Sequence, residues 1–264
     1  MCLRPPRRAC LGTMSMRSKL AARVLAEGSV ALAILGWWAM ARTLPDFILP
    51  GPWDVLKVLV RLFTDTAFLG HTLASFVRVV ASVLAAMLIG GLLALLARVA
   101  PVLQWVVMRR IQPFLNSFPS VGWAILAVIW LDVSNEAVIF VQVIILIPFC
   151  LINISAGLDE IDAEVVEMGR SFTRSPLRLL FRLYLPLLTP YLIAAARISY
   201  GIGWKLALVA ELFGAENGLG YLMVRAQYTG QTSVVVATCL AIVVIFIVGE
   251  KLVIDPLARR FAAR

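Results

Sequence analysis

The sequence predicts an all-α integral membrane protein, on three observations: its composition, its six long apolar stretches and the placement of its basic residues. Of the 264 residues, 61% are hydrophobic and only 15% are charged, and the mean hydropathy is +0.93. Soluble domains have about 45–50% apolar and about 25% charged residues. A water-soluble fold cannot bury this much apolar surface, so we expect one helical membrane domain to use almost the whole chain.

The apolar stretches predict about six transmembrane helices, because about 20 apolar residues cross a bilayer as a helix. They lie at 24–43, 72–97, 102–131, 136–157, 187–212 and 233–253. Pro113 and Pro119 interrupt the third stretch, and proline removes a helix hydrogen bond, so a kinked helix or two half-helices are expected there. Residues 44–63 contain three prolines and an amphipathic stretch. This pattern is typical of an interfacial helix, so 24–66 would hold the first span and an outer interfacial helix.

The basic residues predict the orientation of these spans. With a cytoplasmic amino terminus, most of the 24 Lys and Arg residues fall in cytoplasmic segments, which include a basic tail at 1–23 and a second tail at 256–264. The outer loops then hold only four: Arg42, Lys57, Arg61 and Arg225. Because Lys and Arg collect on the cytoplasmic side of membrane proteins, both termini are expected in the cytoplasm. The net charge of +9 then reports topology, and no nucleic-acid partner is expected.

Residues for metal or nucleotide chemistry are scarce in this sequence. Cys2, Cys10, Cys150 and Cys239 have no paired metal-ligand spacing, and His71 is the only histidine. The sequence therefore has too few histidines for a histidine-rich metal site and little scope for a catalytic triad. The chain contains no G-x-x-x-x-G-K-[ST] loop to hold nucleotide phosphates. We expect a non-catalytic chain without a metal or cofactor of its own.

One charged segment, 159–186, interrupts the hydrophobic sequence. Its acidic residues come before its basic ones, which suits a helix dipole: Asp159, Glu160, Asp162, Glu164 and Glu167 precede Arg170 and Arg174. Its apolar residues recur at helical spacing: Ile161, Val165, Met168 and Phe172. A short amphipathic helix is predicted over 163–174. Ser175 and Pro176 then suit the N-cap and first turn of a second helix.

This segment resembles the EAA loop of binding-protein-dependent ABC importer permeases, whose pattern is E-A-A-x-x-x-G, nine residues and I-x-L-P. The six residues at the matching positions are Glu167, Met168, Gly169, Leu183, Leu185 and Pro186. Thr173 stands where the family usually has glycine, and because threonine tolerates positive φ poorly, a left-handed turn there is in doubt. The wider similarity covers about 70–255 and resembles the nitrate, sulfonate and taurine branch most.

The resemblance implies a type I ABC importer permease fold over 67–255, with a coupling helix that sits in a groove on a cytoplasmic ABC ATPase. The residues that would couple to the ATPase are Glu164, Glu167, Met168, Gly169, Arg170, Ser171, Phe172, Thr173 and Pro186. ATP and Mg²⁺ would bind to that ATPase. The resemblance also implies a bacterial inner membrane location, an extracytoplasmic solute-binding protein and a permease homodimer. The alternative is an interfacial helix that only connects two spans.

Charged residues within or at the ends of the spans are candidates for a solute pathway: Arg78, Arg197, Lys205 and Glu211. An ionised group costs about 2.5–3.5 kcal/mol at mid-depth on insertion scales, so such residues face a cavity or a partner. Arg197 and Lys205 are about 80° apart around a helix, so both could border a pathway for a small anion such as a sulfonate, taurine or nitrate. Alternatively, Arg197 pairs with another helix, and Lys205 and Glu211 extend outward.

A secondary active transporter is the main alternative function, with Arg197, Lys205 and Glu211 as solute or proton sites. It would need internal repeats, which are not clear in the sequence. The turn-rich segment 214–223 is expected as an outer loop that meets a solute-binding protein or simply connects two spans.

Overall fold

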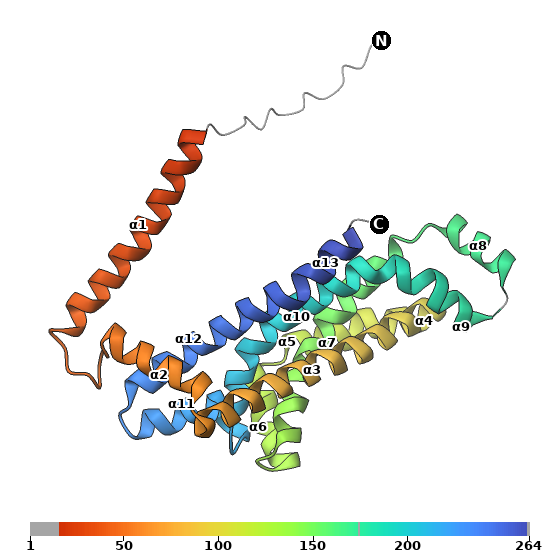
Figure 1. Cartoon of the computed structure of the whole chain (residues 1–264). Helices are drawn as coiled ribbons and strands as arrows, with labels where there is room; N and C mark the ends of the chain where they lie inside the picture. Colours follow the sequence, from red (N-terminus) through yellow and green to blue (C-terminus); the bar gives the residue numbers. More distant parts are fainter. Residues whose placement is uncertain (1–15, 174, 263–264) are drawn as a thin grey trace, which may run out of the picture.

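The computed structural model describes residues 16–173 and 175–262, and all regular structure in this part of the chain is helical, as predicted (Figure 1). Most of the predicted tail 1–23, and Arg174, lie outside the described residues. The elements are α1 (Met16–Ala41), α2 (Pro52–Thr64), α3 (Thr66–Val99), α4 (Pro101–Val106), the π-helical turn η1 (Val107–Ile111), α5 (Gln112–Ser117), α6 (Ser120–Leu131), α7 (Asn135–Asp159), α8 (Ala163–Phe172), α9 (Pro176–Leu179), the π-helical turn η2 (Leu180–Tyr184), α10 (Leu185–Gly214), α11 (Leu219–Tyr228), α12 (Thr232–Gly249), the π-helical turn η3 (Glu250–Ile254) and α13 (Asp255–Ala262).

Within the described residues, four continuous helical segments are long and apolar enough to cross a membrane. They are α3, α7, the segment Pro176–Gly214 and the segment Thr232–Arg260. A bent pair, Pro101–Ser117 and Ser120–Leu131, makes a fifth span if it is counted as one. The first predicted span falls on α1, whose apolar part, Glu27–Ala41, is shorter than the others. The chain is therefore a multi-pass helical membrane protein.

The third predicted span is broken, as its prolines indicated, and the two halves meet at 87°. Phe118 and Pro119 separate them with extended backbone at ψ of 131° and 133°. Proline forces the residue before it out of the helical region, which explains the break. Pro113 causes no break, because Pro101–Ser117 is one continuous helical segment in which the π-helical turn η1 lies directly before this proline.

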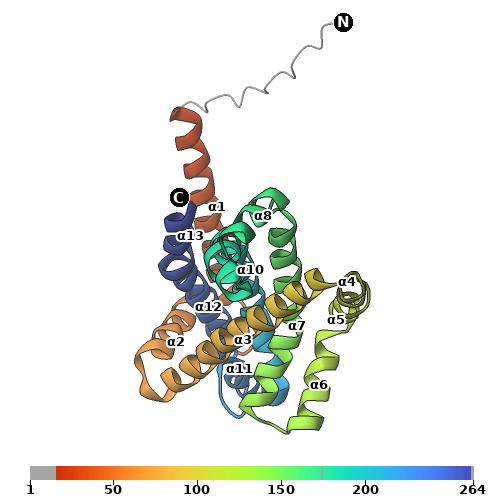
Figure 2. The same cartoon turned by 90° about the vertical axis from the view of Figure 1, so that its right-hand side faces the viewer.

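The centre of the bundle is formed by α7, which packs against both α3 and α10 (Figure 2). One stripe of α3 is buried, and most of its members are small or polar: Thr72, Ser75, Arg78, Val79, Ser82, Val83, Ala86, Gly90, Ala94 and Ala97. Small residues allow helix backbones to approach closely in lipid. The opposite side of α3, with exposed residues such as Leu84 and Leu88, is suited to contact with lipid.

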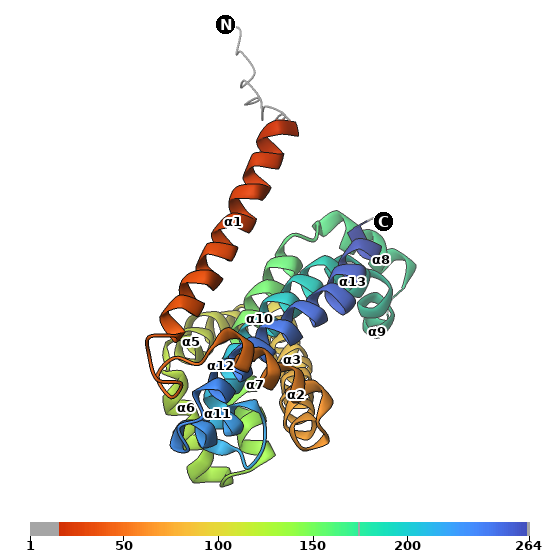
Figure 3. The ribbon, with the colours of Figure 1, turned by 60° about the vertical axis from the view of Figure 1, so that its left-hand side comes forward.

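The predicted interfacial helix is α2, which packs against α12 and α3. Val55 and Leu62 of α2 are buried against the bundle, whereas Trp53 and Val60 are exposed. Helix α1 stands apart from the bundle (Figures 1 and 3), and the indole Nε1 of Trp37 near its end donates to the carbonyl oxygen of Pro50 at 3.1 Å.

The two ends of the bundle carry different elements. Helices α8, α9 and α13 lie at one end, which we call the loop end, and α2 and α11 lie at the other (Figures 1 and 3). The charged segment 159–186 is therefore separated by the length of the bundle from the turn between α10 and α11.

Candidate functional site

The connection between α7 and α10 forms two short helices, as the sequence predicts. The predicted helix over 163–174 is α8, and its last helical residue is Phe172. The second helix begins as predicted, because the Ser175 hydroxyl accepts a hydrogen bond from the N–H of Arg178 at 3.5 Å and Pro176 occupies the first turn. From α9 the chain continues as helix through η2 into α10, with Pro186 in the first turn of α10.

Helix α8 folds back onto α9 and η2 through Gly169. A β-carbon at this position would lie 2.8 Å from Cδ2 of Leu183 and 2.9 Å from Cδ1 of Leu179. Real contacts of this kind are almost never so short, so these two leucines occupy the space of the missing side chain. Val166 is the one buried residue of α8. These contacts hold α8 at the loop end of the bundle.

The remaining candidate coupling residues of α8 are exposed: Glu164, Glu167, Met168, Arg170, Ser171 and Phe172. The predicted apolar face divides into two parts. Ile161 and Val165 are half-buried beside a small pocket that Tyr191 of α10 also lines, whereas the side chains of Met168 and Phe172 are 57% and 84% exposed. The far half of α8 therefore presents two apolar side chains among charged residues, and no other described residue covers them.

Thr173 needs no glycine-like backbone. Its φ and ψ are −155° and 131°, which is an ordinary extended conformation. Its N–H donates to the carbonyl oxygen of Gly169 at 3.3 Å, and its hydroxyl accepts from the N–H of Ser175 at 3.3 Å. The left-handed turn that the family glycine suggested is absent at Thr173, so a β-branched residue fits there without strain.

At the opposite end of the bundle, Arg78 of α3 and Glu211 of α10 form a buried ion pair. Nη1 of Arg78 lies 2.8 Å from Oε1 of Glu211, and the two side chains are 4% and 1% exposed. Such burial is stable only when further hydrogen bonds replace the lost hydration of both ions.

The Glu211 carboxylate accepts two more hydrogen bonds. The Ser75 hydroxyl lies 2.8 Å from both carboxylate oxygens, and the N–H of Gly220 donates to Oε2 at 2.9 Å. Gly218 completes the enclosure, because its φ of 115° is unfavourable for other residues and a β-carbon there would lie 2.4 Å from Oε2. The turn between α10 and α11 therefore closes around this carboxylate.

The Arg78 guanidinium is satisfied by two asparagines. Nε and Nη2 donate to Oδ1 of Asn135 at 2.9 and 2.5 Å, and Nη1 donates to the carbonyl oxygen of Asn217 at 2.8 Å. The Asn217 side chain also accepts from Nη2. This network joins α3, the start of α7 and the α10–α11 turn.

Sequence reasoning singled out Arg78 and Glu211 but missed their polar partners. Ser75, Asn135 and Asn217 lie 136, 57 and 139 residues from their respective partners in the network, so no spacing in the sequence relates them. An available signal was the spacing of Ser75, which lies three residues before Arg78 and so on the same face of α3.

Arg197 and Lys205 do not share a common environment. Nε of Arg197 lies 3.0 Å from Oε1 of Glu250, and Nη2 also pairs with Asp255. Arg197 therefore ties α10 to η3 and α13, which agrees with the alternative that it pairs with another helix. Lys205, eight residues later, is exposed and has no ion-pair partner among the described residues. The assignment of these residues to a solute pathway stays a prediction.

The fold and the loop together define a multi-pass helical transport subunit, and comparison with known proteins identifies its family. Residues 86–262 match the sequence profile of the family described as "Binding-protein-dependent transport system inner membrane component". The chain belongs to this family, and it is a permease of the ABC transporter type.

Several permeases of known sequence are similar to this chain. The taurine transport system permease protein TauC of Escherichia coli is 26% identical over 84% of this chain and 82% of its own length. The nitrate import permease protein NrtB of Leptolyngbya laminosa is 27% identical over 94% of this chain and 91% of its own length. A putative aliphatic sulfonates permease of Escherichia coli, SsuC, is 31% identical over 52% of this chain and 51% of its own length.

The fold is also similar to that of a solved ABC transporter. A chain from an inward facing structure of the MetNI methionine ABC transporter aligns with a TM-score of 0.59 over 79% of this chain and 96% of that chain, at 18% identity. This likeness confirms the type I ABC permease fold that the sequence predicts.

Proposed function

We propose that this chain is the permease subunit of an ATP-driven importer for a small anionic solute, and that α8 couples it to a separate ATPase. The observation that carries the coupling role is the exposed far half of α8. Met168 and Phe172 project beside Glu164, Glu167 and Arg170 at the loop end of the bundle. Exposed apolar side chains rimmed by charges are typical of protein–protein contacts.

In this proposal, α8 sits in a groove on a cytoplasmic ABC ATPase, which binds ATP and Mg²⁺. Gly169 keeps α8 against η2 and α9, and η2 continues directly into the spanning helix α10. A displacement of α8 would therefore be passed to α10 through a rigid contact. This chain would carry out no chemistry itself.

The assembly requires two permease copies, because one chain supplies one coupling helix and family assemblies use two. The loop end would face the cytoplasm in a bacterial inner membrane, together with both termini. The opposite end, with α2 and the α10–α11 turn, would then meet an extracytoplasmic solute-binding protein. The similarity to permeases named for taurine, aliphatic sulfonates and nitrate supports an oxyanion-bearing solute.

For the solute pathway, the structure favours Lys205 among the four charged candidates. Arg78, Glu211 and Arg197 are held in ion pairs within the chain, whereas Lys205 is exposed on a spanning helix. An exposed ammonium group on α10 would attract an anion if this face borders the space between two permease copies.

The coupling role is tested with Glu167→Lys and with a deletion of 163–174. Both proteins should insert into the membrane, but solute uptake and solute-stimulated ATPase activity should be lost. Asp54→Lys on α2 is a control for membrane insertion only, because it also reverses an exposed carboxylate but at the opposite end. Unchanged solute-stimulated ATPase activity in Glu167→Lys and in the deletion would contradict the proposal. Uptake should fail on ATP depletion and survive a protonophore; the reverse result would indicate a secondary transporter.

A further inference from the structure

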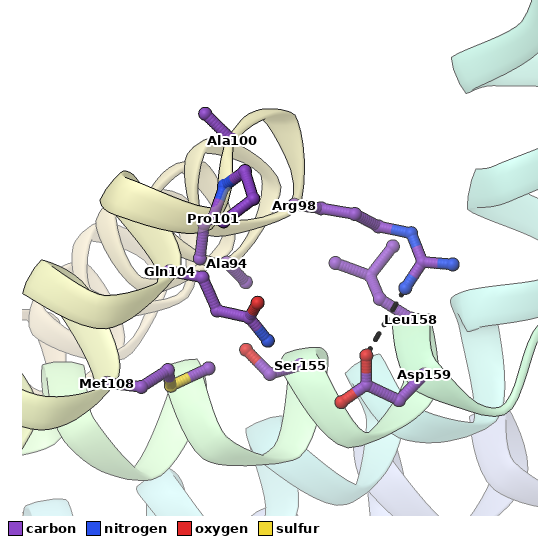
Figure 4. Close-up of a pocket in the computed structure, with 10 residues that line it drawn as sticks. Ala94, Arg98, Ala100, Pro101, Gln104, Met108, Ser155, Leu158 and Asp159 are labelled. Carbon is purple, nitrogen blue, oxygen red and sulfur yellow. Dashed lines mark hydrogen bonds and ion pairs between the residues drawn. The ribbon is translucent and has the colours of Figure 1, made fainter.

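A cavity of about 170 Å³ lies at the loop end, between α3, α4 and the end of α7 (Figure 4). Alanine side chains of α3, together with Met108 and Leu158, form much of its wall. Four polar side chains complete it: Arg98, Gln104, Ser155 and Asp159. The coupling and pathway roles considered above use none of these four residues.

Ser155 gives this cavity the character of a binding site. It is 8% exposed, and its hydroxyl oxygen has no hydrogen-bond partner within the described part of the chain. A buried hydroxyl without a partner is unfavourable, because it has lost water without replacement. In Figure 4 the Ser155 and Gln104 side chains point toward one another across the cavity. A ligand with an oxygen between them would satisfy the hydroxyl.

Two opposite charges lie at the mouth of the cavity. Nη1 of Arg98 is 3.2 Å from Oδ1 of Asp159, and the side chains are 39% and 73% exposed. An exposed ion pair of this kind contributes little to stability. Either side chain can therefore pair with a ligand instead, with little loss of stability. A ligand that carries both an anionic and a cationic group would match the two side chains without leaving either charge unpaired.

The position of the cavity suggests the source of such a ligand. Arg98 is in the last turn of α3, and Asp159 is the last residue of α7. Both are spanning helices, so their ends reach the level of the lipid headgroups. Basic pockets between spanning helices on the cytoplasmic side of a membrane bind lipid head groups, and Arg98 supplies the basic group here.

We propose that this cavity binds a zwitterionic group with one oxyanion and one primary ammonium ion, as in phosphoethanolamine. The Arg98 guanidinium binds the phosphate oxygens, and the Asp159 carboxylate accepts hydrogen bonds from the ammonium group. Ser155 and Gln104 donate to a further phosphate oxygen. The group is supplied either by phosphatidylethanolamine of the adjoining leaflet or by a free zwitterion of the same chemistry.

Native mass spectrometry of the full-length permease in detergent tests this proposal. Delipidated protein is incubated with phosphatidylethanolamine, phosphatidylglycerol or phosphatidylcholine. Phosphatidylethanolamine should be retained preferentially, because phosphatidylglycerol has no cation and the trimethylammonium group of phosphatidylcholine cannot donate to Asp159. Arg98→Gln and Ser155→Val should each weaken retention about tenfold or more, as expected for loss of a charged or buried hydrogen bond.

Lys57→Gln is the matched control, because it removes an exposed cation that pairs with an aspartate on α2, far from the cavity; it should retain the lipid fully. A second arm measures the binding of free phosphoethanolamine by calorimetry. Binding in the lipid arm alone identifies the lipid as the source, and binding of the free compound, lost in the same variants, identifies a soluble one. Equal retention of all three lipids without binding of the free compound, or retention that Arg98→Gln and Ser155→Val leave unchanged, would overturn the proposal.

Discussion

Arg78 and Glu211 are buried charges in a membrane protein, and each depends on the other. Transfer of a single ion into an apolar interior costs several kcal/mol. Here the ion pair is surrounded by hydroxyl, amide and backbone groups that replace water. The pair therefore connects α3 to α10 only while the whole network is intact.

Glu211→Gln should lower the free energy of unfolding by about 3–5 kcal/mol, because it leaves the buried guanidinium of Arg78 without its counter-charge. Unfolding in detergent with increasing dodecyl sulfate, followed by circular dichroism, measures this change. Asp54→Asn removes one member of an exposed pair and should cost at most about 1 kcal/mol. Equal stability of the two variants would contradict the structural role of the network.

Gly218→Ala should destabilise the α10–α11 turn by more than Gly230→Ala. Both glycines have positive φ, of 115° and 70°, but only at Gly218 would a β-carbon strike the Glu211 carboxylate. The backbone cost alone is about 1–2 kcal/mol, and the clash adds to it at Gly218. The same unfolding assay gives the comparison. If Gly230→Ala proved the more damaging change, the closeness of the turn to Glu211 would be disproved.

At the scale of elements, one part of α8 packs against the bundle and the other part is exposed to a possible partner. Val166 is buried and Phe172 is 84% exposed, although both are large apolar residues on one short helix. The difference arises because Val165, Val166 and Gly169 lie against the bundle, whereas Phe172 lies beyond these contacts. Packing and coupling are therefore separable by substitution within α8.

Phe172→Ala should change the free energy of unfolding by less than about 0.5 kcal/mol, as for most exposed positions, while it lowers solute-stimulated ATPase activity of the assembled transporter. Val166→Ala removes buried apolar volume and should reduce stability instead. Unfolding curves and ATPase rates of the two variants are compared side by side. Full ATPase coupling in Phe172→Ala would argue against the exposed end of α8 as the ATPase contact.

At the scale of the whole molecule, the loop end and the end with α11 should face opposite sides of the membrane. In a variant whose four cysteines are replaced by serine, Ser171→Cys on α8 and Glu216→Cys in the α10–α11 turn each supply one exposed thiol. A membrane-impermeant maleimide that crosses only the outer membrane should label Glu216→Cys in intact cells and Ser171→Cys only after the inner membrane is permeabilised. The reverse pattern would invert the proposed topology.

Local sequence signals predicted much of this fold. The apolar stretches located the spanning helices, and Pro119 located the break because proline acts on its own neighbours in the chain. Ser175 and Pro176 predicted the start of α9, because an N-cap side chain and a first-turn proline also act on neighbouring residues of the chain. The short apolar part of α1 and the continuous helix through Pro113 were less predictable, since the apolar run at 24–43 has the length of a span and proline usually interrupts a helix.

The candidate site was predicted only in part. Spacing identified the segment that forms α8, but not which of its apolar residues would be buried. Periodicity predicted one apolar face with Ile161, Val165, Met168 and Phe172, and in the structure the first two are half-buried whereas the last two are exposed. The bundle covers only the near half of that face, because α8 is tethered through Gly169 to Leu179 and Leu183, contacts that periodicity cannot supply.

The sequence by itself determined the helical membrane class, the break in the third span and the charged helical loop between α7 and α10, because apolar run length, proline and local charge order act within a few residues. Only the tertiary structure decided which charges are partners. Arg78 meets Asn135 and Glu211 across 57 and 133 residues of chain, and Arg98 meets Asp159 across 61. Such pairings depend on helix packing, which brings distant residues together at distances that no sequence spacing encodes.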